Sequence, residues 1–198
     1  MEAVKCALKA GHKVRALARS ADIPVSHPDL EKIVGDALDG STIRGALGGV
    51  EVVIQTLGVE FGPETILRGT RLFSEATRVL VNAMQDAGVQ RLISVTGLGA
   101  GNSRDKGGFL YDAAFHLFLD RVYLDKDAQE WIIRKSNLEW VIARPGVLTN
   151  GPITGTYRVL VDPHEWRSGF IPRADVADFL VRQINDDALL GQTPVLTG

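Results

Sequence analysis

Short apolar runs alternate with longer amphipathic segments along the whole chain. At the start, the apolar residues between Ala3 and Leu8 share one face of a predicted helix, which Gly11 ends. Residues 13–18 (KVRALA) then form a mostly apolar run that predicts a short buried strand. The sequence therefore opens with a helix that leads directly into a strand.

The same alternation continues to the last residues. Further apolar runs predict strands at residues 30–36, 51–58, 91–97 and 138–146, with shorter strands at 156–161 and, at a sheet edge, 194–198. Segments with helical periodicity fall at about residues 39–47, 63–87, 109–135 and 174–184. Asp39 or Ser41 is the expected N-cap of the first of these helices, and the glycine-rich residues 97–108 predict a loop.

Strands that alternate with helices indicate an α/β fold, a doubly wound parallel sheet with helices on both faces. The 198 residues suit a single domain, residues 1–198. Ligands of open parallel sheets bind at the carboxyl ends of the strands. The candidate functional residues are therefore those that follow the strands.

Composition narrows the possible functions. The net charge of −2 gives no electrostatic basis for binding nucleic acid or a membrane surface, and no run is apolar enough to span a bilayer. No secretion signal is evident, and the single cysteine, Cys6, excludes an internal disulfide and suits a reducing, cytoplasmic compartment. The four histidines do not cluster with Cys6 at metal-ligand spacing, so no metal site is expected.

The first three strands end in residues that suit a dinucleotide. An arginine at the position of Arg19 accommodates the 2′-phosphate of NADP, whereas an acidic residue there would bond the 2′-hydroxyl of NAD. The carboxylate of Asp36 can meet the adenine, and Gly58 allows close backbone approach. The alternatives are a solvated arginine and a turn with a helix cap. The candidate cofactor-binding residues of these strands are Arg19, Ser20, Asp36, Ala37, Leu57 and Gly58.

Motifs along most of the chain resemble the NmrA-like, atypical short-chain dehydrogenase/reductase family, with a distant likeness to biliverdin reductase B. The resemblance rests on KAGHKVRALARS, IVGDALD, VVIQTLG, LISVTGLGAG, DKDAQEWIIRKSNLEWVIARPGVL and RADVADFLV. It implies a Rossmann-like NAD(P)-binding fold and favours NADP(H) over NAD(H). It does not imply a substrate, because the group contains both reductases and redox-sensing regulators.

The resemblance also implies an element that this sequence lacks. Family members begin with a strand and a turn of the type GATGxxG, whose last glycine would fall here just before Met1. Without that central strand, two hydrogen-bonding edges would lie open within the sheet. We therefore expect the natural protein to start upstream of Met1; the alternative is that another segment or a partner chain fills the gap.

The nicotinamide is expected near the ends of the fourth and fifth strands. Short-chain reductases place a serine or threonine there, with a tyrosine and, four residues later, a lysine. The resemblance assigns the lysine position to Lys126, which would bond the nicotinamide ribose, but Val122 stands four residues before it and Tyr123 only three. The standard tyrosine is thus absent or displaced. The residues expected around the nicotinamide are Thr96, Gly97, Lys126, Pro145, Gly146 and Val147.

The candidate catalytic residues are Thr96, Lys126 and Tyr123, and each has a plainer alternative. Thr96 is either a hydrogen-bond donor to substrate or simply the end of a strand. Lys126 and Glu130 are spaced to form an exposed i,i+4 ion pair with no further role. Arg144 and Asp175 are interpreted as structural, in caps or buried pairs.

The displaced tyrosine favours a flavin or quinone acceptor over a simple ketone, because such an acceptor takes a hydride with little help from a protein acid. Aromatic residues in the segment after the glycine-rich loop line either an acceptor pocket or the core: Phe109, Tyr111, Phe115 and His116. The sequence thus favours an NADP(H)-dependent reductase of a small flavin-, quinone- or carbonyl-type acceptor, acting as a monomer or homodimer. The alternative is a non-catalytic NADP(H)-binding redox sensor, and a third is that this chain without its glycine turn binds no dinucleotide.

Overall fold

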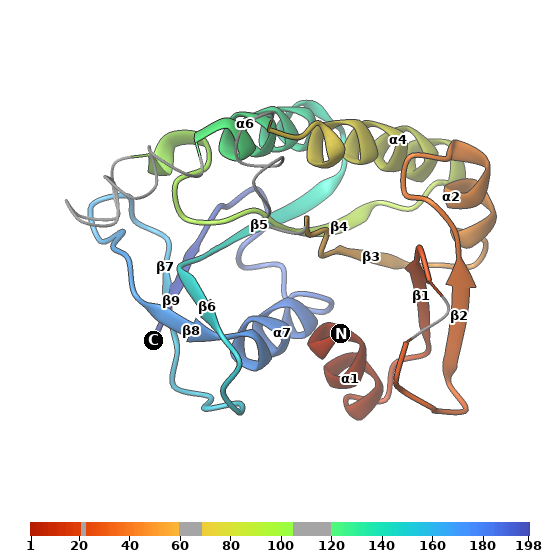
Figure 1. The fold of residues 1–198 in the computed structure, drawn as a ribbon, viewed down its shortest axis with the longest axis horizontal. Helices are drawn as coiled ribbons and strands as arrows, with labels where there is room; N and C mark the ends of the chain where they lie inside the picture. The colour runs from red at the N-terminus through yellow and green to blue at the C-terminus, as the bar shows by residue number, and fades with distance from the viewer. Residues whose placement is uncertain (21–22, 60–68, 105–119) are drawn as a thin grey trace.

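The computed structural model describes residues 1–20, 23–59, 69–104 and 120–198. Strands and helices alternate through these ranges, as Figure 1 shows. The helices are α1 (Glu2–Lys9), α2 (Gly40–Ala46), α4 (Leu72–Ala87), the 3₁₀ turn η1 (Gly101–Ser103), α6 (Asp120–Lys135) and α7 (Arg173–Arg182). The strands are β1 (Val14–Ala18), β2 (Leu30–Val34), β3 (Val52–Gln55), β4 (Arg91–Val95), β5 (Glu139–Pro145), β6 (Val147–Thr149), β7 (Arg158–Leu160), β8 (Phe170–Pro172) and β9 (Val195–Thr197).

The strands form three separate sheets in the described residues. β1 pairs with β2 in parallel, and a five-stranded sheet has the order β3-β4-β5-β9-β7, in which only β7 runs antiparallel. β6 and β8 form a small parallel pair. The predicted α/β fold with a parallel sheet is confirmed, and within the described residues β1 and β3 belong to different sheets.

Helices cover both faces of the sheet. Figure 1 shows α2, α4 and α6 along one face, with α7 and α1 on the other. One buried cluster joins α2 and α4 to β4 and β5 through residues such as Leu80, Met84 and Leu92, and a second packs Phe179 and Leu180 of α7 against the opposite face. Burial on both faces explains why the central strands read as continuous apolar runs.

Three expectations about the elements need correction. The C-terminal strand β9 lies between β5 and β7 and is therefore interior, not an edge. The short strands β6 and β8 were not predicted. Helix α4 begins at Leu72 and residues 69–71 are not helical, so the prediction of one continuous helix from about Pro63 is wrong, whereas residues 63–68 lie outside the described residues. Gly69 has φ +73°, a conformation that does not continue a helix.

Two caps fix the helices that flank the site. Asp39 is the N-cap of α2, and its carboxylate accepts a hydrogen bond of 2.9 Å from the Ser41 N–H. The Asp125 carboxylate on α6 accepts from the Phe73 and Ser74 N–H groups at the start of α4. This tie between α6 and α4 places the helix that holds Lys126 against the sheet.

Candidate functional site

The ends of β4 and β5 lie side by side at the carboxyl edge of the sheet. The Thr96 N–H donates to the Ala143 carbonyl, and the Leu98 N–H donates to the Pro145 carbonyl, both at 2.9 Å. The β4 backbone thus continues beside β5 beyond its last regular residue. These bonds bring Thr96 and Gly97 next to the end of β5, as the sequence predicts for strands that share a sheet.

Buried charges hold this corner together. Arg144, fully buried at the end of β5, donates two hydrogen bonds to Glu130 of α6, from Nε to Oε1 at 2.9 Å and from Nη2 to Oε2 at 2.6 Å. A third bond, from Nη1 to Asn102 Oδ1, is 2.8 Å long, and the guanidinium carbon lies 5.1 Å from the centre of the Trp166 ring. The interpretation of Arg144 as a buried structural pair is consistent with these contacts.

The Thr96 hydroxyl belongs to the same cluster. It donates to Glu130 Oε1 at 2.9 Å, and the residue is buried. The hydroxyl proton of Thr96 is thus donated to Glu130, whereas the hydroxyl oxygen can still accept a hydrogen bond. Thr96 therefore ends a strand and also joins that end to the Glu130–Arg144 pair.

Lys126 does not form the exposed ion pair that its spacing to Glu130 allows. Both residues are buried, and Glu130 is paired with Arg144 and, at 3.5 Å, with Arg134. The Lys126 ammonium instead lies 4.0 Å from the centre of the Phe73 ring. Burial lowers the pKa of Lys126 to about 8, although the negative charges of Glu130 and Asp125 oppose this effect.

Tyr123 reaches the end of β4 despite its displaced position in the sequence. It is buried one helical turn before Lys126, and a Cβ placed on Gly97 would lie 2.5 Å from the Tyr123 hydroxyl oxygen. The absence of a side chain at Gly97 thus leaves room for this hydroxyl. The Tyr123 phenol therefore lies at the carboxyl end of β4, and Lys126 follows it on the same helix.

The end of β5 turns sharply. The Gly146 N–H donates to the Leu196 carbonyl at 2.9 Å, and a Cβ on Gly146 would lie 2.4 Å from the Gly169 carbonyl oxygen, so only glycine fits. Pro145 is buried as the last residue of β5, whereas Val147 opens β6 and is exposed. These residues line the edge where the nicotinamide is expected.

The ends of the first strands are more open. Arg19 and Ser20 are exposed after β1, and Arg19 makes no hydrogen bond or ion pair to the described residues. The Asp36 carboxylate accepts a hydrogen bond of 2.9 Å from the Leu38 N–H and so forms a turn, the alternative to its predicted contact with adenine. The N-cap of the helix that follows is Asp39.

The remaining residues at these ends also line or border open space. Ala37 and Leu57 line a cavity between β1 and β3, and a Cβ on Gly58 would meet no atom within 4 Å. The four aromatic residues Phe109, Tyr111, Phe115 and His116, proposed to line an acceptor pocket, lie outside the described residues.

Sequence reasoning missed a buried polar network beneath the site. The Gln55 side-chain oxygen Oε1 accepts from Ser94 Oγ, Thr77 Oγ1 and Gln129 Nε2 at 2.9–3.2 Å, so the network joins β3, β4, α4 and α6. The polar ends of apolar runs, Gln55 and Ser94, were its signal in the sequence. Asp175 was interpreted as structural, as a cap or in a buried pair. It is buried and accepts from Thr154 and Gly155, 21 and 20 residues away, so it is a buried partner that anchors the loop before β7.

The donors at the strand ends fit an anionic dinucleotide. Arg19 and Lys126 are cations from opposite sides of the break in the sheet, and neither has a carboxylate within ion-pair distance in the described residues. Such cations suit a phosphate and a ribose. Arg19 would hold the adenosine end of the cofactor and Lys126 the nicotinamide end, and the cofactor would supply the hydride.

Comparison with known proteins identifies the family. A family model described as NAD(P)H-binding matches residues 1–187. The chain belongs to this NAD(P)H-binding family. Together with its motifs and its Rossmann-like sheet, the match makes this NAD(P)H-binding protein a member of the atypical, NmrA-like short-chain group, a group of the oxidoreductase class.

Relatives differ in how much of each chain aligns. A 3-beta-hydroxysteroid dehydrogenase of Mycolicibacterium neoaurum is 33% identical over 108 residues, 51% of this chain, but the chain spans only 28% of that relative. An uncharacterized sugar epimerase, YhfK, of Bacillus subtilis (strain 168) is 30% identical over 93% of this chain and 85% of its own length. The solved structure of ChuY, an anaerobillin reductase from Escherichia coli O157:H7, is 28% identical with a TM-score of 0.79, over 99% of this chain and 89% of that one.

None of the helices within the described ranges combines the length and the apolar character that a membrane span requires.

Proposed function

We propose that this NAD(P)H-binding protein is an NADP(H)-dependent reductase that transfers a hydride to a small flavin-, quinone- or carbonyl-type acceptor. The single observation that carries the proposal is the position of the Tyr123 hydroxyl beside Gly97, with the buried Lys126 about one turn further along the same helix. A hydroxyl against Gly97 and a buried ammonium from the same helix suit a hydride-transfer site, where one group bonds the acceptor and the other orients the cofactor. The likeness to an anaerobillin reductase supports a reductase as well.

The second candidate is a regulator that binds NADP(H) without turnover. It is favoured by the Thr96 hydroxyl, which donates to Glu130 inside the protein rather than toward an acceptor. A site that lacks an available donor on β4 still binds a cofactor, because binding uses cations and backbone, but it transfers protons less readily.

The rate of NADPH oxidation, followed by absorbance, distinguishes the reductase from the regulator. The 198-residue chain is mixed with NADPH and with a panel of one flavin, one quinone and one ketone, and NADPH oxidation is followed against a reaction without protein. We expect oxidation with the flavin or the quinone and little with the ketone. Oxidation with the ketone alone contradicts the expected acceptor class, and saturable NADPH binding with no oxidation by any acceptor favours the regulator.

Arg19 is proposed to select NADP(H). Replacing it with alanine removes a charge-assisted bond to the 2′-phosphate, so we expect NADPH affinity to fall by about tenfold, the equivalent of one such bond. NADH affinity should stay within about twofold of its original value, because NADH has no 2′-phosphate. Calorimetric titration of both proteins with both nucleotides measures this, and an equal loss for NADPH and NADH would contradict a role in selection. Arg44 on the exposed side of α2 is the matched control position.

A further inference from the structure

A short pair of strands extends the structure beyond the end of β5. β5 ends at Pro145, Gly146 follows it, and β6 begins at Val147 with β8 parallel to it. The Val147 N–H donates to the Gly169 carbonyl at 2.8 Å, and the absence of a side chain at Gly146 lets that carbonyl approach closely. The position of β6 and β8 is thus fixed relative to the edge where the nicotinamide is expected.

The two faces of this strand pair have different surroundings. Val147 of β6 lies opposite Phe170 of β8 in the register, and Ile171 is the next residue along β8. Opposite residues of paired strands share a face, whereas successive residues of one strand point to opposite faces. Ile171 is fully buried in the cluster that contains Phe179 of α7. Val147 and Phe170 therefore lie on the face that is turned away from α7.

The face of β6 and β8 that carries Val147 and Phe170 is apolar and exposed. Phe170 is 71% exposed and Val147 is 39% exposed. The next pair on this face, Thr149 with Pro172, carries no charge. Within the described residues, no aromatic ring and no cation stacks on the Phe170 ring. Since an aromatic ring gains free energy when its face leaves water, this ring suits a flat apolar ligand better than a charged one.

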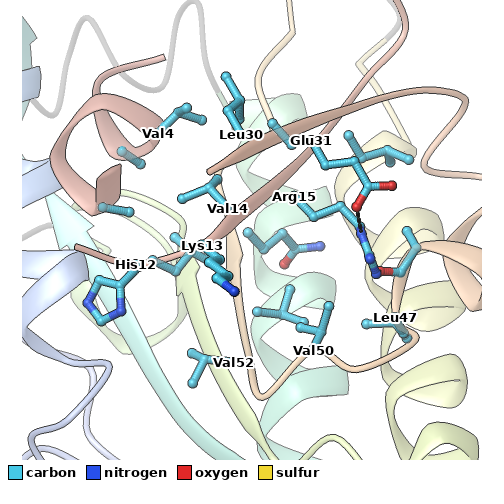
Figure 2. A pocket seen from close by; sticks show the side chains of 18 of the residues that line it. Val4, His12, Lys13, Val14, Arg15, Leu30, Glu31, Leu47, Val50 and Val52 are labelled. Atoms are coloured by element: carbon cyan, nitrogen blue, oxygen red, sulfur yellow. Dashed lines mark hydrogen bonds and ion pairs between the residues drawn. The ribbon is translucent and has the colours of Figure 1, made fainter. Parts of the chain in front are cut away.

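This exposed face is remote from the first strands. The cavity between β1 and β3, whose lining side chains Figure 2 shows, lies at the opposite end of the molecule from β6 and β8 in Figure 1. The exposure of Phe170 therefore does not depend on what occupies that cavity.

The distance from the nicotinamide edge to Phe170 limits the size of an acceptor that touches both. The β4 backbone runs beside the end of β5 up to the bond between Leu98 and Pro145, so Gly97 lies close to Pro145. Val147 stands two residues beyond Pro145, about 7 Å at the rise of a strand, and the neighbouring strand lies about 5 Å to one side. Phe170 is thus about 9 Å from the end of β5. That distance is close to the length of three fused rings, and a single ring or a simple ketone is too short for it.

We propose that the exposed face of Val147 and Phe170 is a stacking platform for an extended, flat and uncharged acceptor of fused rings. One end of the acceptor lies at the nicotinamide edge beside Gly97, and its far ring lies on Phe170. This inference rests on the proposed reductase function and narrows its acceptor to molecules of this length. Phe170 then determines specificity, because only an acceptor that reaches it gains the stacking contact.

Binding of riboflavin, a flavin with three fused rings, tests the platform separately from turnover. Quenching of riboflavin fluorescence is titrated with the intact 198-residue chain and saturating NADP⁺, which has no hydride to give. We expect saturable binding by the parent and about tenfold weaker binding by Phe170→Ala, which lacks the stacked ring. Phe170→Tyr keeps the ring and should bind riboflavin as the parent does.

Trp131→Ala is the matched control. Trp131 is another large exposed ring, but it lies on α6 rather than on β6 or β8, so its loss should leave riboflavin binding unchanged. Circular dichroism checks that all three variants fold, as expected for changes to exposed side chains. Steady-state NADPH oxidation gives a second measure, because the KM for riboflavin should rise about tenfold in Phe170→Ala while the KM for NADPH stays unchanged.

The outcomes for the platform and for the reductase are distinguishable. Equal binding of riboflavin by the parent and by Phe170→Ala, or no binding by the parent, would overturn the platform. NADPH oxidation with an unchanged KM for riboflavin in Phe170→Ala would reject the platform and retain the reductase. Riboflavin binding that depends on Phe170, without any NADPH oxidation, would support the platform as a ligand site and contradict the reductase.

Discussion

Replacing Arg144 with methionine is expected to lower the free energy of unfolding by about 3–5 kcal/mol. The guanidinium is fully buried and bonds both carboxylate oxygens of Glu130, whose side chain is 2% exposed. Methionine fills similar space but leaves the Glu130 charge buried with the Thr96 hydroxyl bond and the 3.5 Å contact to Arg134, neither of which replaces a two-bond pair with a guanidinium. Urea denaturation of the two proteins, followed by circular dichroism, measures the difference.

Two further variants distinguish an uncompensated charge from lost packing. The double variant Glu130→Gln with Arg144→Met removes both charges and should recover at least about half of the loss, because a neutral pair has no ionic desolvation cost. Arg182→Met breaks the exposed pair with Asp178 on α7 and should cost less than about 1 kcal/mol. An Arg144 variant no less stable than the Arg182 variant would show that the buried pair does not hold the corner together.

The alternation of strands and helices was predictable because a strand that is buried on both faces needs apolar residues at successive positions. Strands such as Val14–Ala18 and Arg91–Val95 appear where those runs stand. The strands β6 and β8 left no such signal, since each has three residues and includes exposed apolar side chains such as Val147 and Phe170. The position of β9 inside the sheet depends on its antiparallel pairing with β7, a long-range contact that local periodicity does not encode.

The site was predictable in its location but not in its pairings. Thr96, Gly97 and Pro145 follow their strands and therefore meet at one edge. The partner of Glu130 was not predictable, because spacing on a helix favours Lys126, and only the packing of α6 against β5 brings Arg144 within 2.6 Å. The cavity between β1 and β3 depends on how α1 and α2 pack against these strands, which local periodicity does not encode.

Lys126→Met is expected to stabilise the protein at pH 7 by about 2–3 kcal/mol, and this effect should depend on pH. Burial lowers the pKa of Lys126 to about 8, whereas the unfolded chain has the ordinary value of 10.5. The unfolded state therefore binds more protons between pH 8 and 10.5, so stability rises with pH in this window, and below it the burial cost is fully present. The contact with Phe73 offsets only part of this cost. Urea denaturation at pH 7 and pH 10 should show a gap between variant and parent that closes at the higher pH.

The same substitution should weaken NADPH binding by about 10- to 100-fold, the equivalent of one hydrogen bond from a charged donor. A buried ammonium with no carboxylate within ion-pair distance among the described residues lowers stability, and such a residue is retained where binding requires it. Calorimetric titration of the Lys126→Met variant with NADPH tests this, with Lys135→Met, at the exposed end of the same helix, as the matched control. Gain of stability together with loss of affinity identifies Lys126 as a ligand-binding cation that the fold holds at a cost. Unchanged affinity in a less stable variant would instead make Lys126 part of the packing around Phe73, and the nicotinamide end of the site would then need another donor.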